Sequence, residues 1–358
     1  MRTVKGLRAG LALAAVMSVT VLANAASAQN ERRFTTERPG SILIFPKVIN
    51  TSNRSTVIQI TNTSNMLRRA HCFYINGATI NGFQLWQITD FELALTRQHP
   101  THWSTEDGRP FDPSDEAAGI DPGSVPPTSP DFTGALVCVQ VNVGGDPDGA
   151  NSLKGEATIA TTENDGVIAV SKYNAIAIQA MPNNPGGGTT GPNSDNVLKL
   201  DNIEYAACPA GAHLNFTAEG AQDDIVNDLG DGPSVVSTTL AFLPCDMDFE
   251  NLVPGRTVLA FESFNEMEEG QSGSFTVDCW REINLGATEM GPLTETRLGS
   301  TYGYMRLVAD SVGAVGVANV LRVGQNGAVS TAATNLHFVG NNPEESLDSP
   351  PSEIRLPQ

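Results

Sequence analysis

The sequence has few basic residues, few aromatic residues and only one long apolar run. Its 358 residues include 21 Lys and Arg against 40 Asp and Glu, and aromatic residues make up 6%. The acidic balance argues against nucleic acid and anionic lipid as partners. Because the one long apolar run lies at the N-terminus, we expect no membrane span in the mature chain.

Local catalytic motifs are missing as well. The patterns GxSxG, GxxxxGK[ST], HExxH and CxxC do not occur, which argues against the nucleophile elbow, the phosphate loop, the zincin helix and paired cysteines. A pair of glycosidase carboxylates has no local spacing rule, so a hydrolase stays an alternative. The sequence predicts a protein that is not an enzyme and that carries no cofactor.

The first residues predict export. Arg2, Lys5 and Arg8 precede an apolar run from Ala9 to about Leu22, and Ala26-Ser27-Ala28 follows with the small-x-small pattern that a signal peptidase cleaves. We therefore predict a signal peptide over residues 1–28 and a mature chain in the periplasm or outside the cell. That chain has 18 basic and 40 acidic residues, a net charge of −22.

The mature part contains all five cysteines, and an exported chain can form disulfides. Cys245 follows one predicted strand and Cys279 ends another, so we predict a Cys245–Cys279 bridge if these strands are neighbours. For the first half we predict Cys72–Cys138, although Cys208 is an equally available partner for either cysteine. An odd count leaves one thiol over.

Two stretches resemble each other and suggest an internal duplication. Thr257–Trp280 repeats Thr56–Phe73 loosely: each reads as a strand, a polar turn and a strand that closes on Cys and an aromatic residue. Upstream, Ile42–Pro46 matches Leu240–Pro244, and shorter matches follow in the same order. The alternative is that strands share short motifs because they use few residue types.

Strand-like alternation and frequent Gly and Pro predict an all-β fold. We expect a polar leader at 29–40, a β-sandwich unit at 41–220, an acidic linker at 221–232, a second unit at 233–340 and a disordered tail at 341–358. Three insertions enlarge the first unit: Ser104–Asp131, Gly144–Ser152 and Met181–Asn196. The second unit is close to the ~100 residues of an immunoglobulin-type sandwich.

The segment TVIQITNTSN resembles exported bacterial domains of the immunoglobulin-like kind, in which an apolar strand runs into a Thr-Asn-Thr-Ser turn. The chain also resembles exported bacterial proteins that carry HCFY and PTHW segments. The first resemblance implies two tandem immunoglobulin-like β-sandwich units. Neither implies an activity.

Few residues qualify as ligands. Asp146, Asp148 and Asn151 form an oxygen-rich loop that suggests calcium, but Ala150 and the missing twelfth-position Glu break the EF-hand pattern. His99 and His102 flank Pro100, so a shared helical face for zinc is not expected. Trp86 and Trp103 could form a sugar-stacking platform, although strand tryptophans more often lie in the core.

The sequence thus favours an exported, non-enzymatic β-sandwich protein with a structural or adhesive role in the bacterial cell envelope. Its partner there is unknown. A glycan- or calcium-binding module is the first alternative, and a hydrolase is the second.

Overall fold

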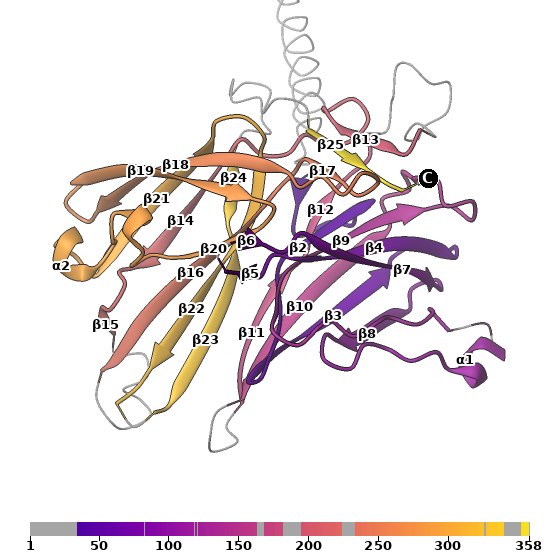
Figure 1. Cartoon of the computed structure of the whole chain (residues 1–358), viewed down its shortest axis with the longest axis horizontal. Coiled ribbons are helices and arrows are strands. Elements are labelled where there is room, and N and C mark those ends of the chain that lie inside the picture. The colour runs from indigo at the N-terminus through magenta and orange to yellow at the C-terminus, as the bar shows by residue number, and fades with distance from the viewer. Residues whose placement is uncertain are drawn as a thin grey trace, which may run out of the picture. The chain divides into compact units, whose positions relative to one another are not determined.

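The computed structural model describes residues 34–81, 83–117, 119, 121–162, 168–181, 195–223, 233–325, 327–339 and 352–357. The regular structure of these residues is almost entirely β-strand (Figure 1), which confirms the all-β class. No helix among them is long and apolar enough to cross a membrane. The short helical turns are α1 (Pro113–Ala117), η3 (Thr288–Met290) and α2 (Glu295–Leu298).

The first sandwich has two sheets. Sheet 1A contains, in spatial order, β12 (Ile176–Ile178), β2 (Ile42–Thr51), β9 (Phe132–Val141), β4 (Arg68–Asn76) and β7 (Gln87–Leu95), with β1 (Phe34–Thr35) beside β12. Sheet 1B contains β11 (Ile168–Asn174), β10 (Leu153–Thr162), β3 (Arg54–Asn62) and β8 (Pro100–Ser104). A small hairpin, β5 (Thr79–Ile80) with β6 (Phe83–Gln84), lies outside both.

The two sheets of the first sandwich join at one hairpin and then separate. β2 and β3 pair through Asn50 with Ser55 and Thr51 with Arg54. Farther along, the Phe45 ring of β2 lies so close to Gly155 of β10 that a Cβ on Gly155 would be 2.6 Å from a ring carbon. The sheets therefore face each other across a shared core, and glycine at 155 makes room for the ring.

The second sandwich also has two sheets. Sheet 2A contains β24 (His337–Val339), β14 (Gly211–Thr217), β21 (Tyr302–Ala309), β18 (Arg256–Asn265) and β19 (Gly270–Asp278). Sheet 2B contains β23 (Val329–Asn335), β22 (Ala314–Val323), β16 (Ser234–Pro244) and β20 (Arg281–Asn284), with β15 (Gln222–Asp223) also on β16.

The two sandwiches have the same strand order. The strands correspond in chain order: β2 with β14, β3 with β16, β4 with β18, β7 with β19, β8 with β20, β9 with β21, β10 with β22, β11 with β23 and β12 with β24. The antiparallel ladders that join the strands of each sheet also correspond one by one. The same order of strands and ladders thus occurs twice in the described residues.

The two leading matches of the repeat that the sequence suggested are out of register by one strand. The first of them matched β3 and β4 with β18 and β19, but β3 and β4 lie in different sheets whereas β18 and β19 pair directly. The unit boundary moves too, since β14 falls within the first unit expected at 41–220 but pairs with β21 of the second sandwich. The immunoglobulin-like part is not confirmed, because the described ladders do not follow the ABED and CFG order.

A third, smaller sheet covers the outer face of sheet 1A. It contains β13 (Val197–Leu200), β25 (Ser352–Arg355) and β17 (Met247–Asp248). Next to β17, the Phe249 ring stacks on Phe73 of β4 with 4.2 Å between centroids, and Ile354 and Leu356 are buried in the first core. The predicted disordered tail is therefore wrong for 352–357, because its apolar residues have a sheet face to cover.

Other expected segments are corrected in part or lie outside the described residues. The leader is not wholly loose, since Phe34 and Thr35 pair with β12 and Gly40 bridges to Leu153. In the expected linker, Gln222 and Asp223 pair with β16. The signal peptide, residues 224–232, 340–351 and most of Met181–Asn196 lie outside the described residues.

The two sandwiches share sheet 2B. Because side chains alternate along a strand, its two faces belong to different cores. Leu240, Phe242, Ala314 and Ala318 lie in the second core, whereas Ala241, Leu243, Val315 and Val317 lie in the first. This burial on both faces explains why the runs LAFLP of β16 and AVGVA of β22 are apolar without a polar side.

A buried ion pair lies in the contact between the sandwiches. Lys47 of β2 is 1% exposed, and its Nζ donates to Glu282 of β20 and, at 3.0 Å, to Thr239 of β16. Burial lowers the pKa of Lys47. Burial alone would raise the pKa of Glu282, but the charge and hydrogen bond of Lys47 hold that pKa below its ordinary value.

We expect Glu282→Gln to lower the free energy of unfolding by roughly 3 kcal/mol, because it leaves the Lys47 ammonium buried without its partner. The matched control is Asp278→Asn, which breaks the exposed Arg256–Asp278 pair and should cost less than about 1 kcal/mol. Because the pKa of Glu282 is lower folded than unfolded, its contribution is complete above the ordinary carboxylate range and is lost as pH falls through the lowered pKa. Denaturant titrations across that pH range measure the free energy of unfolding of each variant and its pH dependence. Equal losses of unfolding free energy in the two variants would contradict the assignment.

The structure contains two disulfides, which indicate an oxidising compartment. Cys72 and Cys138 lie directly opposite each other on β4 and β9 and are joined, the pair expected from the sequence. Cys245 is joined to Cys208 and not to Cys279, which is a buried free thiol. The expected Cys245–Cys279 bridge is corrected because β16 lies in sheet 2B while β19, which leads to Cys279, lies in sheet 2A.

Non-reducing peptide mapping of the protein should recover Cys208 linked to Cys245 and Cys279 as a thiol. Burial, with a smaller contribution from Asp278, raises the pKa of Cys279 to about 12. Since the thiolate is the reactive form, iodoacetamide should modify Cys279 only after unfolding. Rapid labelling of Cys279 in the folded protein would contradict this placement.

Candidate binding groove

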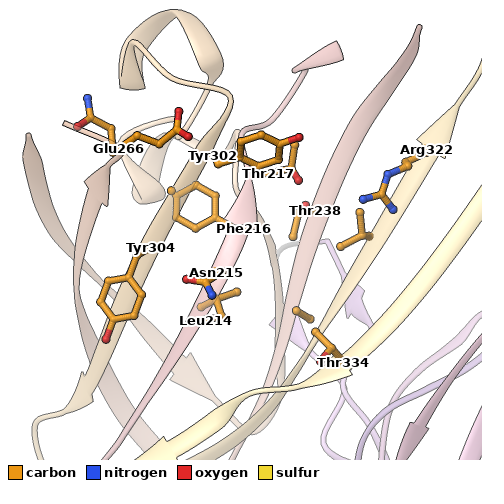
Figure 2. A pocket seen from close by; sticks show the side chains of 14 residues that line it. Leu214, Asn215, Phe216, Thr217, Thr238, Glu266, Tyr302, Tyr304, Arg322 and Thr334 are labelled. Carbon is orange, nitrogen blue, oxygen red and sulfur yellow. The ribbon is translucent and has the colours of Figure 1, made fainter. Parts of the chain in front are cut away.

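A groove of about 530 Å³ lies in the second sandwich, between β14 of sheet 2A and β23 of sheet 2B (Figure 2). It opens because the chain changes sheets at Leu336. β23 pairs with β22 up to Asn335, and β24 pairs with β14 from His337 onward. Past His213 the described ladders leave one edge of β14 without a neighbouring strand.

The interior of the groove is apolar. Leu214 and Phe216 of β14 form one wall, and Ala318 and Val320 of β22 form part of the other. The Phe216 ring lies over Gly303 of β21, where a Cβ would be 2.5 Å from a ring carbon, so this position requires glycine. Asn215, Thr217, Thr238, Asn265, Glu266, Tyr302, Tyr304, Arg322 and Thr334 complete the lining.

Two tyrosines stand at the mouth of the groove. Tyr302 and Tyr304 are 51% and 39% exposed, and in the β14–β21 ladder they lie opposite Thr217 and Asn215. Alternate residues of a strand point to the same side, so both rings lie on the outer face of sheet 2A. Figure 2 shows Tyr302 and Phe216 across the groove from Arg322 and Thr334.

The polar groups of the lining differ in what they already bind. Asn265 donates to the Leu298 carbonyl at 2.7 Å, and Glu266 accepts from Ser300 at 2.5 Å. The Thr238 hydroxyl is different: it is buried and has no hydrogen-bond partner among the described residues. A buried hydroxyl without a partner costs free energy, so a ligand in this groove could satisfy it.

The corresponding place in the first sandwich is filled. In the first sandwich the chain changes sheets at Ala175, and Tyr173 lies two residues before that point, opposite Ala157. In the second sandwich the chain changes sheets at Leu336, and Thr334 lies two residues before that point, opposite Ala318. Tyr173 and Thr334 therefore occupy equivalent positions. The Tyr173 hydroxyl donates to the Lys47 carbonyl at 2.6 Å and accepts from the Lys47 N–H at 3.2 Å. Threonine is too short to fill that space.

The facing strand differs in the same way. Ile44 pairs with the first residue of β12, Ile176, and His213 pairs with the first residue of β24, His337, so Ile44 and His213 are equivalent. Two residues farther along each strand, Pro46 therefore corresponds to Asn215. Proline has no N–H, and the Pro46 carbonyl accepts from Trp280 Nε1 at 2.6 Å. The second sandwich supplies that tryptophan, so it closes the edge of the first.

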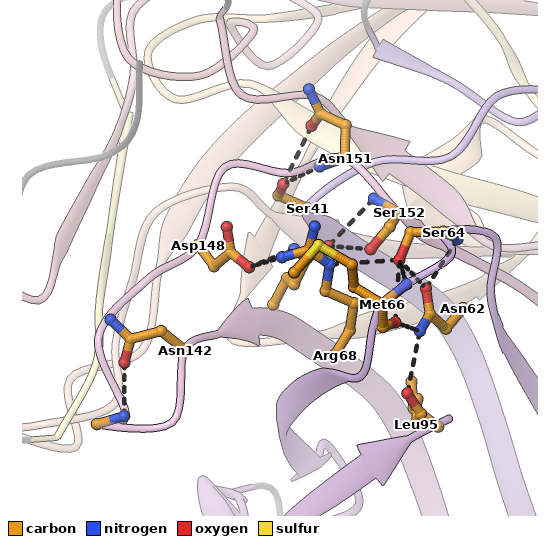
Figure 3. A network of polar contacts seen from close by, with 12 residues as sticks. Ser41, Asn62, Ser64, Met66, Arg68, Leu95, Asn142, Asp148, Asn151 and Ser152 are labelled. Atoms are coloured by element: carbon orange, nitrogen blue, oxygen red, sulfur yellow. Dashed lines mark hydrogen bonds and ion pairs between the residues drawn. The ribbon is translucent and has the colours of Figure 1, made fainter. Parts of the chain in front are cut away.

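The residues that the sequence proposed for calcium serve other contacts, and Figure 3 shows two of them, Asp148 and Asn151. Asp148 accepts from Arg68 at 2.9 Å and from Gln140 at 2.8 Å. Asn151 accepts from Ser41 and donates to the Ala180 carbonyl, and Asp146 accepts from Asn142. In the described ranges no three His, Cys, Asp or Glu residues form a group that could hold a metal ion.

The tryptophans do not form a platform. Trp103 is buried in the first core and donates to the Tyr74 hydroxyl at 2.5 Å, and Trp86 is half-buried against that core. His99 and His102 are exposed around the start of β8. The groove residues were missed by sequence reasoning, although the alternation in Tyr302-Gly303-Tyr304 and in Asn215-Phe216-Thr217 is visible there.

No protein-family model and no curated protein matches the chain. Among solved structures it is similar to the Thermotoga maritima protein 1070, with 7% identity over 39% of this chain and 95% of that one and a TM-score of 0.26. It is also similar to a CBM22-1–CBM22-2 tandem domain from Paenibacillus barcinonensis Xyn10C (11% identity, 78% and 85% coverage, TM-score 0.16). A third is a Pleurotus ostreatus lectin solved with GalNAc (13% identity, 88% and 90% coverage, TM-score 0.18). At such scores these likenesses carry no argument about function.

Proposed function

We propose that this is an exported, non-enzymatic binding protein with a structural or adhesive role in the bacterial envelope, and that it holds its partner in the groove of the second sandwich. The observation that carries the proposal is the contrast between the sandwiches. At one place in the fold, Tyr173 and Trp280 close the first sandwich, whereas Asn215 and Thr334 leave the second open.

The arrangement suits binding without chemistry. The groove has apolar walls, a small set of polar groups and two exposed tyrosines, which is the usual composition of a ligand site. Its one carboxylate in the lining, Glu266, already accepts a hydrogen bond from Ser300. The acidic chain should approach a neutral or basic partner most readily.

Thr334→Tyr should fill the groove as Tyr173 fills its counterpart. We expect the share of mature protein that sediments with envelopes of the producing bacterium to fall, with a binding loss of about tenfold or more, or ~1.4 kcal/mol. The matched control is Thr162→Tyr, at an exposed threonine near the end of β10. Unchanged envelope binding by a folded Thr334→Tyr protein would overturn the proposed function.

A carbohydrate is the second candidate partner, favoured by the exposed Tyr302 and Tyr304 rings. Sugars stack on exposed aromatic faces, and neighbouring polar groups fix their orientation. A glycan array should then show retention that Tyr302→Ala and Tyr304→Ala each reduce by about tenfold. Phe111→Ala, at an exposed aromatic residue outside the groove, serves as the control and should have no effect. An array without retained glycans removes this candidate.

A further inference from the structure

We propose that the open edge of β14 accepts an extended polypeptide segment of a partner protein as an added β-strand. The added strand would continue the line of β24 and place alternate apolar side chains in the groove. This inference rests on the proposed function and names the class of partner.

The main chain of β14 has groups directed at that edge. The Ala309 N–H donates to the Ala210 carbonyl at 2.7 Å, and the Ala218 N–H donates to the Thr301 carbonyl at 2.8 Å. In an antiparallel ladder the residues that bond to one neighbour alternate with those that face away. The even-numbered residues of β14 therefore bond to β21, and the odd-numbered residues face the other side.

β24 pairs with only part of that other side. Gly211 and His213 lie opposite Val339 and His337. Asn215 and Thr217 come next, and no described residue outside β21 pairs with their main chain. Their N–H and C=O groups thus form an unpaired strand edge, which is a template for another strand.

The first sandwich blocks the same edge by three means. Pro46 removes the N–H that Asn215 retains, Trp280 occupies the Pro46 carbonyl, and the Tyr173 hydroxyl caps Lys47. Proteins commonly blunt strand edges with proline and with covering side chains. One copy of the fold is blocked at this edge, and the other copy is open. This contrast indicates that the edge of β14 is kept for a partner.

The chemistry favours a polypeptide over a sugar at this edge. Donor and acceptor groups repeat at every second residue, about 6.6 Å apart, which matches the main chain of another strand. The inner walls, Leu214, Phe216, Ala318 and Val320, offer apolar surface to side chains of one parity. The unpartnered Thr238 hydroxyl in the same lining can bond to a polar atom of the inserted segment.

The test starts with a phage-displayed heptapeptide library. It is selected on the full mature protein and counter-selected on Thr334→Tyr. We expect enriched peptides to alternate apolar and polar residues. The best peptide is then synthesised with single N-methyl groups and its binding is measured by calorimetry. N-methylation at residues of one parity should abolish binding, and N-methylation at the other parity should change it less than threefold.

Two variants of the protein, rather than of the peptide, test the edge of β14 itself. Asn215→Pro copies Pro46 and removes an N–H that the β21 ladder does not use, so it should weaken the selected peptide at least tenfold. Asn215→Ala keeps the N–H, so it should weaken the selected peptide much less than Asn215→Pro does. Near-ultraviolet circular dichroism checks that Asn215→Pro is folded; if it is not, the N-methyl series alone decides.

The failures of the two proposals are distinct. If envelope binding depends on Thr334 but no alternating peptide is enriched, or N-methylation acts equally at both parities, strand addition is overturned and the proposed function stands. Retention of a glycan that Asn215→Pro leaves unchanged likewise overturns strand addition. If Thr334→Tyr leaves envelope binding intact, the proposed function itself fails.

Discussion

The structure depends on the burial of sheet 2B on both of its faces. β16 and β22 of that sheet each contribute alternate residues to two different cores, so the second sandwich cannot be removed without exposing the first. The Lys47–Glu282 pair and the Trp280–Pro46 hydrogen bond fix the polar part of the same contact. Apolar burial supplies the stabilisation, and these polar contacts set the register.

The contact between the sandwiches also makes them differ in which edge and face stay accessible, although their strand orders are the same. The second sandwich covers the first at Pro46 and Lys47, and the three-stranded sheet covers the outer face of sheet 1A. The corresponding edge and face of the second sandwich keep Asn215, Tyr302 and Tyr304 accessible. One half of the chain is therefore completed by intramolecular contacts, and the other half presents the groove.

Local pattern in the sequence is sufficient to predict strands but not their order. The alternation in TVIQITN and in FELAL predicts β3 and β7 because each has one buried face. The same alternation misplaced the leading matches of the repeat by one strand, since any two strands of this kind match. Cys245 was paired wrongly because the sheet of each strand is a long-range property. The groove depends on Thr334 standing where the other sandwich has Tyr173, a comparison that requires the correct strand correspondence.

The position of β25 has a consequence for biogenesis. Ile354 and Leu356 are among the last residues of the sequence, yet they complete the core of the sandwich that begins with β2. A chain that is synthesised from its N-terminus presents this strand after the strands of the first sandwich that it covers. Until then the outer face of sheet 1A lacks part of its cover, so the first half to emerge is the last to be finished. Such an order leaves the first sandwich incomplete until β25 has been synthesised.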